Sequence, residues 1–228
     1  MTTPTTAPKS TPNITLYGIG VSAFVAKVRI ALDLKALAHR EVPPPGGYGA
    51  PEYRAIVPAG SIPGLVIDGH AVHESNAILE LLEEIAPEPP LLPATPMDRA
   101  RARALLGFHD QRVEAAARAF FPLVKQPSPD PAAVETAAQG IEAALERLSE
   151  IVSPAPFAFG AAPGLADIAY PCTVQMARMM ADALGRPLAI PPAIDAWLAH
   201  TGEIPAVARS LTLHHDAMAS WIGSFRPA

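Results

Sequence analysis

Hydrophobic and polar positions follow two different rhythms in the first part of the chain. Residues 14–17 alternate apolar and polar side chains with a period of two, which predicts a β-strand. From Ser22 onward the apolar residues recur at helical spacing, which predicts a helix that begins at that serine. Residues 38–42 are expected to form a second strand, ended by a loop rich in proline and glycine.

A β-hairpin is expected next along the chain. Two short apolar runs, 64–67 and 70–73, flank an Asp-Gly pair, which is among the strongest sequence signals for a two-residue turn. Residues 74–76, Glu-Ser-Asn, then precede apolar residues at helical spacing, which predicts a capped helix. The predicted order is therefore strand, helix, strand, long loop, two strands and a helix.

A proline-rich stretch divides the chain. Residues 87–96, PEPPLLPATP, are too dense in proline for a helix or a central strand and are typical of a linker. Beyond it the apolar positions repeat only at helical spacing. The pattern predicts a loose tail at 1–12, an α/β domain at 13–87, a linker at 88–97 and an all-helical domain at 98–228.

Composition narrows the class of protein. Half of the 228 residues are hydrophobic and 17% are charged, which excludes wholesale disorder. A net charge of −5 argues against nucleic acid as a main partner, and no apolar run is long enough to predict a membrane span. The single cysteine, Cys172, excludes an intrachain disulfide, and the scattered histidines give no metal-ligand spacing. A reducing, cytoplasmic location and a tail without export function are therefore expected.

Ser22 stands where the predicted first strand turns into the predicted first helix. A hydroxyl there adds a donor to the unpaired N–H groups and the positive end of the helix dipole, and together these groups stabilise an anion. The same position is also typical of an ordinary N-cap serine with a purely structural role. The Gly-x-Ser-x-Gly pattern of hydrolase nucleophiles is absent around it.

Two further segments could present polar groups to a ligand. A cis bond before Pro63 would turn the backbone N–H and C=O of Ile62 toward a peptide-like ligand, whereas a trans bond would simply open an edge strand. Glu74 and Ser75, at a helix start, could hold the ammonium and carboxylate of an α-amino acid, or could form an ordinary capped helix start. In isolation, both segments are compatible with a structural role.

Taken together, these segments resemble the glutathione S-transferase family. The resemblance covers residues 14–86 and rests on three motifs in the family's order and spacing: Leu16-Tyr17 and Ser22 with the run 27–32, the run 58–63, and Asp68-Gly69 with the run 74–78. In the helical part, Gly164-Leu-Ala-Asp167 resembles the family's helix-capping motif, usually Ser/Thr-x-x-Asp, with glycine at the cap.

The resemblance implies a thioredoxin-like α/β domain followed by an all-α domain, in a homodimer that takes glutathione as co-substrate and no metal. Ser22 would donate a hydrogen bond to the glutathione thiolate, as in the serine-using theta and phi groups. Ile62, before a cis Pro63, would pair with the backbone of the tripeptide's cysteine. Glu74 and Ser75 would hold the γ-glutamyl ammonium and carboxylate.

The glycyl end of the implied site departs from the family pattern. Many relatives have Asn-Pro-x-Gly-Lys/Gln where this chain has Val57-Pro-Ala-Gly-Ser61, and a basic residue or histidine at the position of Tyr48. Tyr48 and Ser61 are therefore expected to hold the glycyl end with lower affinity. Tyr17 is an alternative thiolate donor, although its side chain is expected on the other side of the turn from Ser22.

The leading hypothesis is a glutathione transferase in which the thiolate attacks a small electrophile between the two domains. Alternatives are a non-catalytic binding or assembly module of the same fold, and a glutathione-dependent dehalogenase, peroxidase or isomerase. The Ser-Ser-Cys run of maleylacetoacetate isomerases is absent, since Ala23 and Phe24 follow Ser22, which argues against that isomerase. The electrophile is expected to contact residues of the first and last helices of the helical domain: Phe108, His109 and Arg112, with Trp221 or Phe225.

Overall fold

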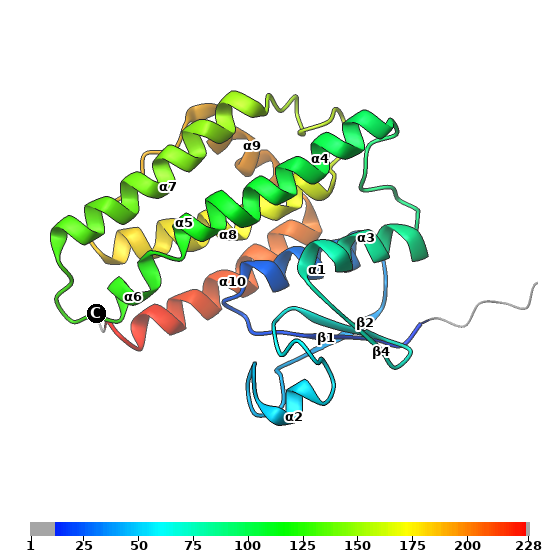
Figure 1. Cartoon of the computed structure of the whole chain (residues 1–228). Helices are drawn as coiled ribbons and strands as arrows, with labels where there is room; N and C mark the ends of the chain where they lie inside the picture. Colours follow the sequence, from blue (N-terminus) through cyan, green and yellow to red (C-terminus); the bar gives the residue numbers. More distant parts are fainter. Residues whose placement is uncertain (1–11, 227–228) are drawn as a thin grey trace, which may run out of the picture.

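The first part of the chain forms a four-stranded sheet with helices on both faces (Figure 1). The computed structural model describes residues 12–226. The elements in chain order are β1 (Ile14–Tyr17), α1 (Ala23–Leu34), β2 (His39–Val42), α2 (Pro51–Arg54), β3 (Gly64–Ile67), β4 (His70–His73) and α3 (Ser75–Ile85). The order and the thioredoxin-like fold agree with the sequence prediction, except that the expected long loop contains the short helix α2.

The sheet has the strand order β2-β1-β3-β4, in which β1 and β2 are parallel and the other neighbours are antiparallel. The Asp-Gly turn between β3 and β4 has a positive φ at both residues, 49° at Asp68 and 86° at Gly69. Type I′ turns require this backbone, and they match the right-handed twist of the two strands. The predicted hairpin is therefore confirmed, with its turn at the predicted residues.

The remainder of the chain is helical. Its elements are α4 (Pro96–Phe108), the π-helical turn η1 (His109–Glu114), α5 (Ala115–Ala117), α6 (Phe120–Val124), α7 (Pro131–Ile151), α8 (Leu165–Ala183), α9 (Pro192–Gly202) and α10 (Pro205–Gly223). Proline stands in the first turn of α4, α7, α9 and α10, where its missing N–H costs no hydrogen bond. α8 is buried along most of its length and forms the centre of this domain.

α1 lies between the sheet and the helical bundle, and packs against α3, α8 and α10 (Figure 1). Its apolar residues are therefore buried on nearly all sides, and the two basic residues among them need internal partners. Arg29 donates to both carboxylate oxygens of Glu41, each at 2.6 Å, and to the Ser210 hydroxyl at 3.0 Å. Strand β2, α1 and α10 are joined by this one guanidinium.

The segment between α3 and α4 is anchored to the sheet domain. Leu91 and Leu92 are buried, and their N–H groups donate to the carboxylate of Glu83. Lys35, whose side chain is fully buried, pairs with the same carboxylate at 2.6 Å and donates to the carbonyl of Pro89. The proline-rich stretch is therefore a packed connection, and α4 begins within it, at Pro96.

No helix in the described range 12–226 is long and apolar enough to cross a membrane.

Candidate active site

The turn from β1 into α1 presents Ser22 at the start of the helix. Gly18 allows this turn, because a Cβ there would lie 2.4 Å from a methyl carbon of Val25. Ser22 is the N-cap of α1, and its Oγ accepts a hydrogen bond from the Val25 N–H at 3.3 Å. The hydroxyl proton is therefore available to a further acceptor, beside the positive end of the helix.

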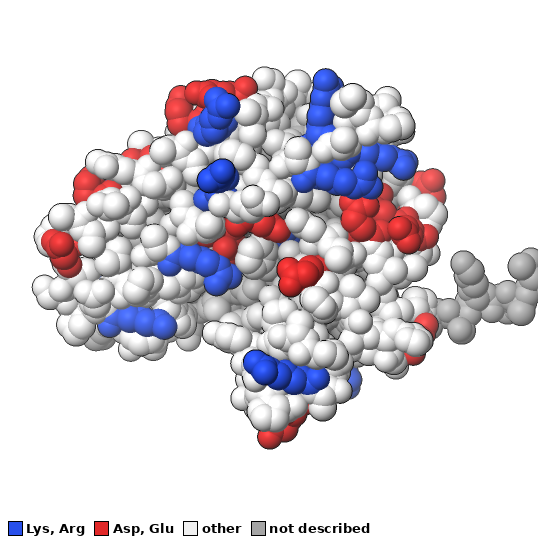
Figure 2. Space-filling view, in the orientation of Figure 1, with Lys and Arg blue, Asp and Glu red and all other residues white. Residues whose placement is uncertain are grey.

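Ser22 lines a cavity of about 580 Å³ between the sheet domain and the helical domain. Figure 2 shows a recess between these two parts, with Lys and Arg side chains on its helical side. The cavity is mostly apolar, with a few polar groups converging on it, as expected for a small-molecule site. Its lining residues are Ile19, Val21, Ser22, Ala23, Tyr48, Ser61, Ile62, Glu114, Arg118, Phe121, Lys125, Met176 and Trp221.

The sheet-domain wall is held by a buried tyrosine of α2. The Tyr53 hydroxyl donates to the Ser61 carbonyl at 2.9 Å, and burial raises the pKa of Tyr53 to about 12, so it remains a donor. Gly64 makes room for this hydroxyl, since a Cβ there would lie 2.3 Å from it. The Ile62–Pro63 bond is cis. Ser61 and Ile62 thus face the cavity from a fixed loop, and the exposed Tyr48 also lines it.

The helical wall carries an internal ion pair and an aromatic pair. The Arg118 Nε donates to both oxygens of the buried Glu114 carboxylate, at 2.9 and 2.7 Å. Arg118 lowers the pKa of Glu114, but the larger effect of burial raises it above its usual value. The rings of Phe121 and Trp221 meet edge to face with their centroids 5.0 Å apart. Both rings give this side of the cavity an apolar surface.

Three residues expected at the glutathione site lie outside the lining of this cavity: Pro63, which follows Ile62, and the pair expected at the γ-glutamyl group, Glu74 and Ser75. Glu74 is the N-cap of α3 and has a positive φ of 67°, an uncommon conformation for a residue with a side chain. Its carboxylate is largely exposed, whereas Ser75 is buried in the first turn of α3. The backbone at Glu74 is thus held in a costly conformation directly before a helix N-terminus.

The expected electrophile residues occupy other places. His109 is fully buried, with Nδ1 2.7 Å from Asp110 Oδ1 and Nε2 2.8 Å from Thr173 Oγ1. Phe108 packs against the core, and Arg112 is exposed and outside the cavity lining. The cavity wall lies further along the same helical segment, at Glu114 and beyond, because the turn at His109 faces α8 and the interior.

At the C-terminal end of α10, Trp221 lies in the cavity wall. Phe225 packs against Trp221 with the rings tilted by 59° and their centroids 5.2 Å apart, and is not itself among the lining residues. Tyr17, the alternative thiolate donor, packs its ring against Tyr53 and is also absent from the lining. Of the two candidate hydroxyls, only that of Ser22 therefore faces the cavity.

A buried polar cluster behind Ser22 was not predicted from the sequence. Lys27 Nζ donates to Asn76 Oδ1 and Asp110 Oδ1, both at 2.8 Å, and Asn76 donates to the other oxygen of Asp110 at 2.9 Å. Burial lowers the pKa of Lys27, against the attraction of Asp110. Burial by itself would raise the pKa of Asp110, but the hydrogen bonds and charges of His109 and Lys27 outweigh this effect, so the pKa is lowered. A lysine within the apolar run of α1 was the available signal for such a cluster.

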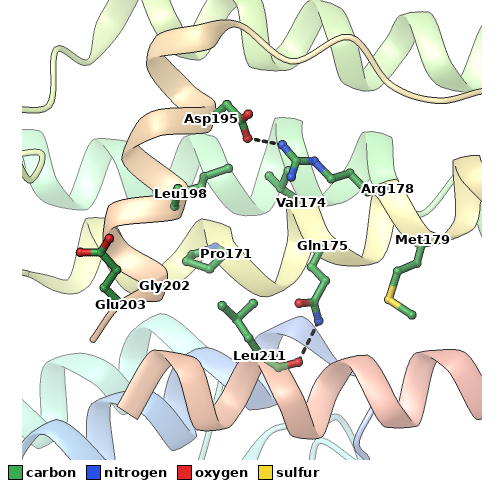
Figure 3. Close-up of a pocket in the computed structure, with 11 residues that line it drawn as sticks. Pro171, Val174, Gln175, Arg178, Met179, Asp195, Leu198, Gly202, Glu203 and Leu211 are labelled. Atoms are coloured by element: carbon green, nitrogen blue, oxygen red, sulfur yellow. Dashed lines mark hydrogen bonds and ion pairs between the residues drawn. The ribbon is translucent and has the colours of Figure 1, made fainter. Parts of the chain in front are cut away.

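A second cavity, of about 520 Å³, lies between α8, α9 and α10 (Figure 3). Gln175 donates to the Leu211 carbonyl at 3.0 Å inside it, and Arg178 pairs with Asp195 at its rim. It shares no lining residue with the Ser22 cavity. Within residues 12–226, no group of three or more His, Cys, Asp or Glu side chains is placed to hold a metal ion.

The chain matches known proteins over both parts. Residues 16–90 match the glutathione S-transferase N-terminal domain, and residues 131–200 match the glutathione S-transferase C-terminal domain. A probable glutathione S-transferase from Zea mays is 33% identical over 217 residues, which cover 86% of this chain and 89% of the relative. A maleylacetoacetate isomerase from Pseudomonas aeruginosa is 34% identical over 163 residues, which cover 67% and 76% of the two chains.

Among solved structures, the theta-class glutathione S-transferase of Xanthomonas axonopodis pv. citri, crystallised with glutathione bound, superposes with a TM-score of 0.73. It is 25% identical, and the match covers 88% of this chain and 97% of that structure. The relatives thus include transferases and an isomerase, and they span more than one class. Sequence motifs, fold and relatives agree, and the chain belongs to the glutathione S-transferase family.

Proposed function

We propose that this protein is a glutathione transferase in which Ser22 stabilises the glutathione thiolate for attack on a small electrophile. The observation that carries the proposal is the placement of the Ser22 hydroxyl. It stands at the N-terminus of α1, faces the cavity between the domains, and accepts from Val25 so that its own proton is available. A thiolate bound there is stabilised by the hydroxyl and by the helix dipole.

The energetic requirement is modest. A free thiol has a pKa of about 8.5, and lowering it by about two units makes the bound thiol mostly ionised at pH 7. This shift requires about 2.7 kcal/mol of preference for the thiolate, at about 1.4 kcal/mol per unit. One hydrogen bond to a charged group and a helix N-terminus together supply that amount.

The proposal assigns the remaining glutathione contacts to the wall of the sheet domain and to the start of α3. Ile62 offers its backbone to the cysteinyl part of the tripeptide, and Tyr48 and Ser61 meet the glycyl end from the sheet-domain wall. Glu74 and Ser75 hold the γ-glutamyl ammonium and carboxylate at the start of α3. The electrophile then occupies the space toward Phe121 and Trp221. A homodimer is part of the same proposal, and sedimentation of the purified protein tests it.

Replacing Ser22 by alanine tests the proposed role. Thiolate absorbance in the ultraviolet, followed across pH with glutathione bound, should give a thiol pKa clearly below 8.5 for the native protein and at least one unit higher for Ser22→Ala. The rate of conjugation at pH 6.5 should fall at least tenfold with it. Tyr17→Phe is the matched control and should change neither quantity. An unchanged thiol pKa in Ser22→Ala would reject the assignment.

A second candidate activity is glutathione-dependent isomerisation, and the similarity to a maleylacetoacetate isomerase favours it. In such a reaction the thiolate adds to a cis double bond, the adduct rotates about the resulting single bond, and elimination returns the thiolate and the trans product. It uses the same Ser22 site, although Ala23 and Phe24 replace the Ser-Cys pair of that isomerase class. Turnover of a cis-enone dicarboxylate with glutathione unconsumed would distinguish it from conjugation.

Glutathione binding distinguishes these two enzymatic activities from a non-catalytic binding or assembly module of the same fold. Calorimetric titration with glutathione should show binding in the millimolar range or tighter. No binding at millimolar glutathione would favour the module.

A further inference from the structure

We propose that the electrophile of this enzyme carries an anionic group, a carboxylate above all, and that Lys125 binds it. The proposal rests on the proposed function, because it concerns the substrate that the Ser22 thiolate attacks. It adds a class of substrate and names the residue that selects it.

The first observation is the balance of charge around the cavity. Three charged side chains line it, and two of them, Glu114 and Arg118, neutralise each other through the two contacts described above. Lys125 forms no ion pair with any carboxylate of residues 12–226. The described wall of the cavity therefore has a net positive charge, and among its cations in residues 12–226 Lys125 is the one without a carboxylate partner.

The second observation is the surface beside that ammonium. Lys125 is the C-cap of α6, one helical turn after Phe121. Its Nζ lies 6.0 Å from the ring centroid of Phe225, which in turn packs against Trp221. A point charge at the edge of an aromatic surface suits a molecule with an apolar or aromatic body and an anionic end. Because Lys125 and Ser22 line the same cavity, such a molecule would bind with its anion at Lys125 and its reactive carbon toward Ser22.

The third observation separates this anion from the carboxylates of glutathione. The residues proposed to hold the tripeptide belong to the sheet domain, whereas Lys125 belongs to the helical domain. Tyr48 and Ser61, not Lys125, stand on the wall that carries Ile62. The cation on the helical wall is therefore assigned to the second substrate.

A matched pair of probes tests the proposal: 4-chloro-3-nitrobenzoate and its methyl ester. In both, the thiolate sulfur bonds to the ring carbon that carries chlorine, and the C–Cl bond breaks with its electron pair to release chloride. The acid carries a negative charge that the ester lacks, and the uncatalysed rates with glutathione correct for the different reactivity of the two rings. For the native protein we compare kcat/KM for the acid with kcat/KM for the ester. This ratio should be several-fold higher than the same ratio of the uncatalysed rates with glutathione.

The variant Lys125→Met should lose about tenfold in kcat/KM for the acid, mainly through a higher KM, and less than twofold for the ester. The KM for glutathione should stay unchanged. Arg147→Met is the control, because it removes one positive charge from the exposed surface of α7, away from the cavity lining. Equal losses for acid and ester, or a raised KM for glutathione instead, would overturn the assignment of Lys125.

Binding without chemistry keeps this test independent of the proposed reaction. Calorimetry with 3-nitrobenzoate and methyl 3-nitrobenzoate, in the presence of S-methylglutathione, compares affinities when no thiolate is available. Tighter binding of the acid by native protein, lost in Lys125→Met and weakened by added salt, supports the proposal. Native protein that binds both compounds equally overturns it. If the native protein bound the acid more tightly than the ester but did not turn over either chlorinated probe, the transferase activity would be rejected and the anion site would be supported.

Discussion

At Gly164, the first residue of the capping motif, the available space dictates glycine. Its φ of −132° suits any residue, but a Cβ there would lie 2.8 Å from the Leu91 carbonyl oxygen. That oxygen accepts a hydrogen bond from Leu165 N at 2.8 Å and so ties the segment before α4 to the start of α8. The departure from the family's Ser/Thr therefore has a local cause. Asp167 still caps the helix by accepting from the Gly164 N–H at 2.8 Å.

Gly164→Ala should destabilise the protein by about 1–3 kcal/mol, because the added methyl meets backbone that cannot move without breaking the contact to Leu165. Gly164→Ser, which restores the common motif, should do the same. Urea unfolding measures both. Gly140→Ala in α7 is the control: a Cβ there would meet nothing within 4 Å beyond its own helix, and alanine should stabilise by about 0.5–1 kcal/mol. Equal stability of the Gly164 variants and native protein would contradict the packing argument.

At the scale of elements, Lys27, Asn76 and Asp110 join α1, α3 and η1 through one set of hydrogen bonds. These elements come from both domains, so the cluster fixes how the helix that begins at Ser22 sits against the helical domain. The π-helical turn contributes to this arrangement, because His109 and Asp110 follow each other at its start and both reach the cluster. Such turns occur often at functional sites.

Lys27→Met should lower the free energy of unfolding by about 3 kcal/mol, since it leaves the Asp110 carboxylate without its cation in a mostly buried place. Lys27→Met combined with Asp110→Asn should recover part of that loss. Thermal or urea unfolding gives the values. Arg101→Met, which breaks an exposed pair with Asp98, should cost less than about 1 kcal/mol. Additive losses in the double variant would show that the two charges are not coupled.

Elements that depend on neighbouring residues could be predicted from the sequence, whereas contacts between distant segments could not. Strands, the Asp-Gly hairpin and the serine-capped helix depend on neighbouring residues, so periodicity and turn chemistry identified them. α2 escaped prediction because four residues are too few for a helical period. The cavity residues Ser22, Tyr48, Ser61 and Ile62 came from motifs within the sheet domain. The residues of the cavity's helical wall could not be predicted in this way. The orientation of η1 and α6 relative to α1 is set by packing between segments that are distant in the sequence.

At the scale of the whole molecule, two buried histidines make stability depend on pH. Burial lowers the pKa of His109 and of His214 from 6.5 to about 4. Both imidazoles are therefore neutral in the folded protein over a range where the unfolded chain takes up protons. Because the unfolded state binds more protons between pH 6.5 and pH 4, stability falls as pH drops through that window.

We expect a loss of about 1.4 kcal/mol per pH unit for each of the two histidines below pH 6.5, and no change from them above it. Urea midpoints at pH 7, 6 and 5 measure the slope. His214→Asn should reduce the slope by about half. Stability that stays constant from pH 7 to pH 5 would contradict this account.

The turn that carries Ser22 rests on α10. A Cβ on Gly20 would lie 2.7 Å from the Ala217 side chain, and the backbone of Val21 lies beside the His214 imidazole. A chain that ended before Pro205 would retain the strand, the turn and the serine but not the surface that seats them. The thiol acidity proposed for Ser22 would thus also report whether α10 is docked against this turn, and a nascent chain that lacks α10 would not yet have a seated serine.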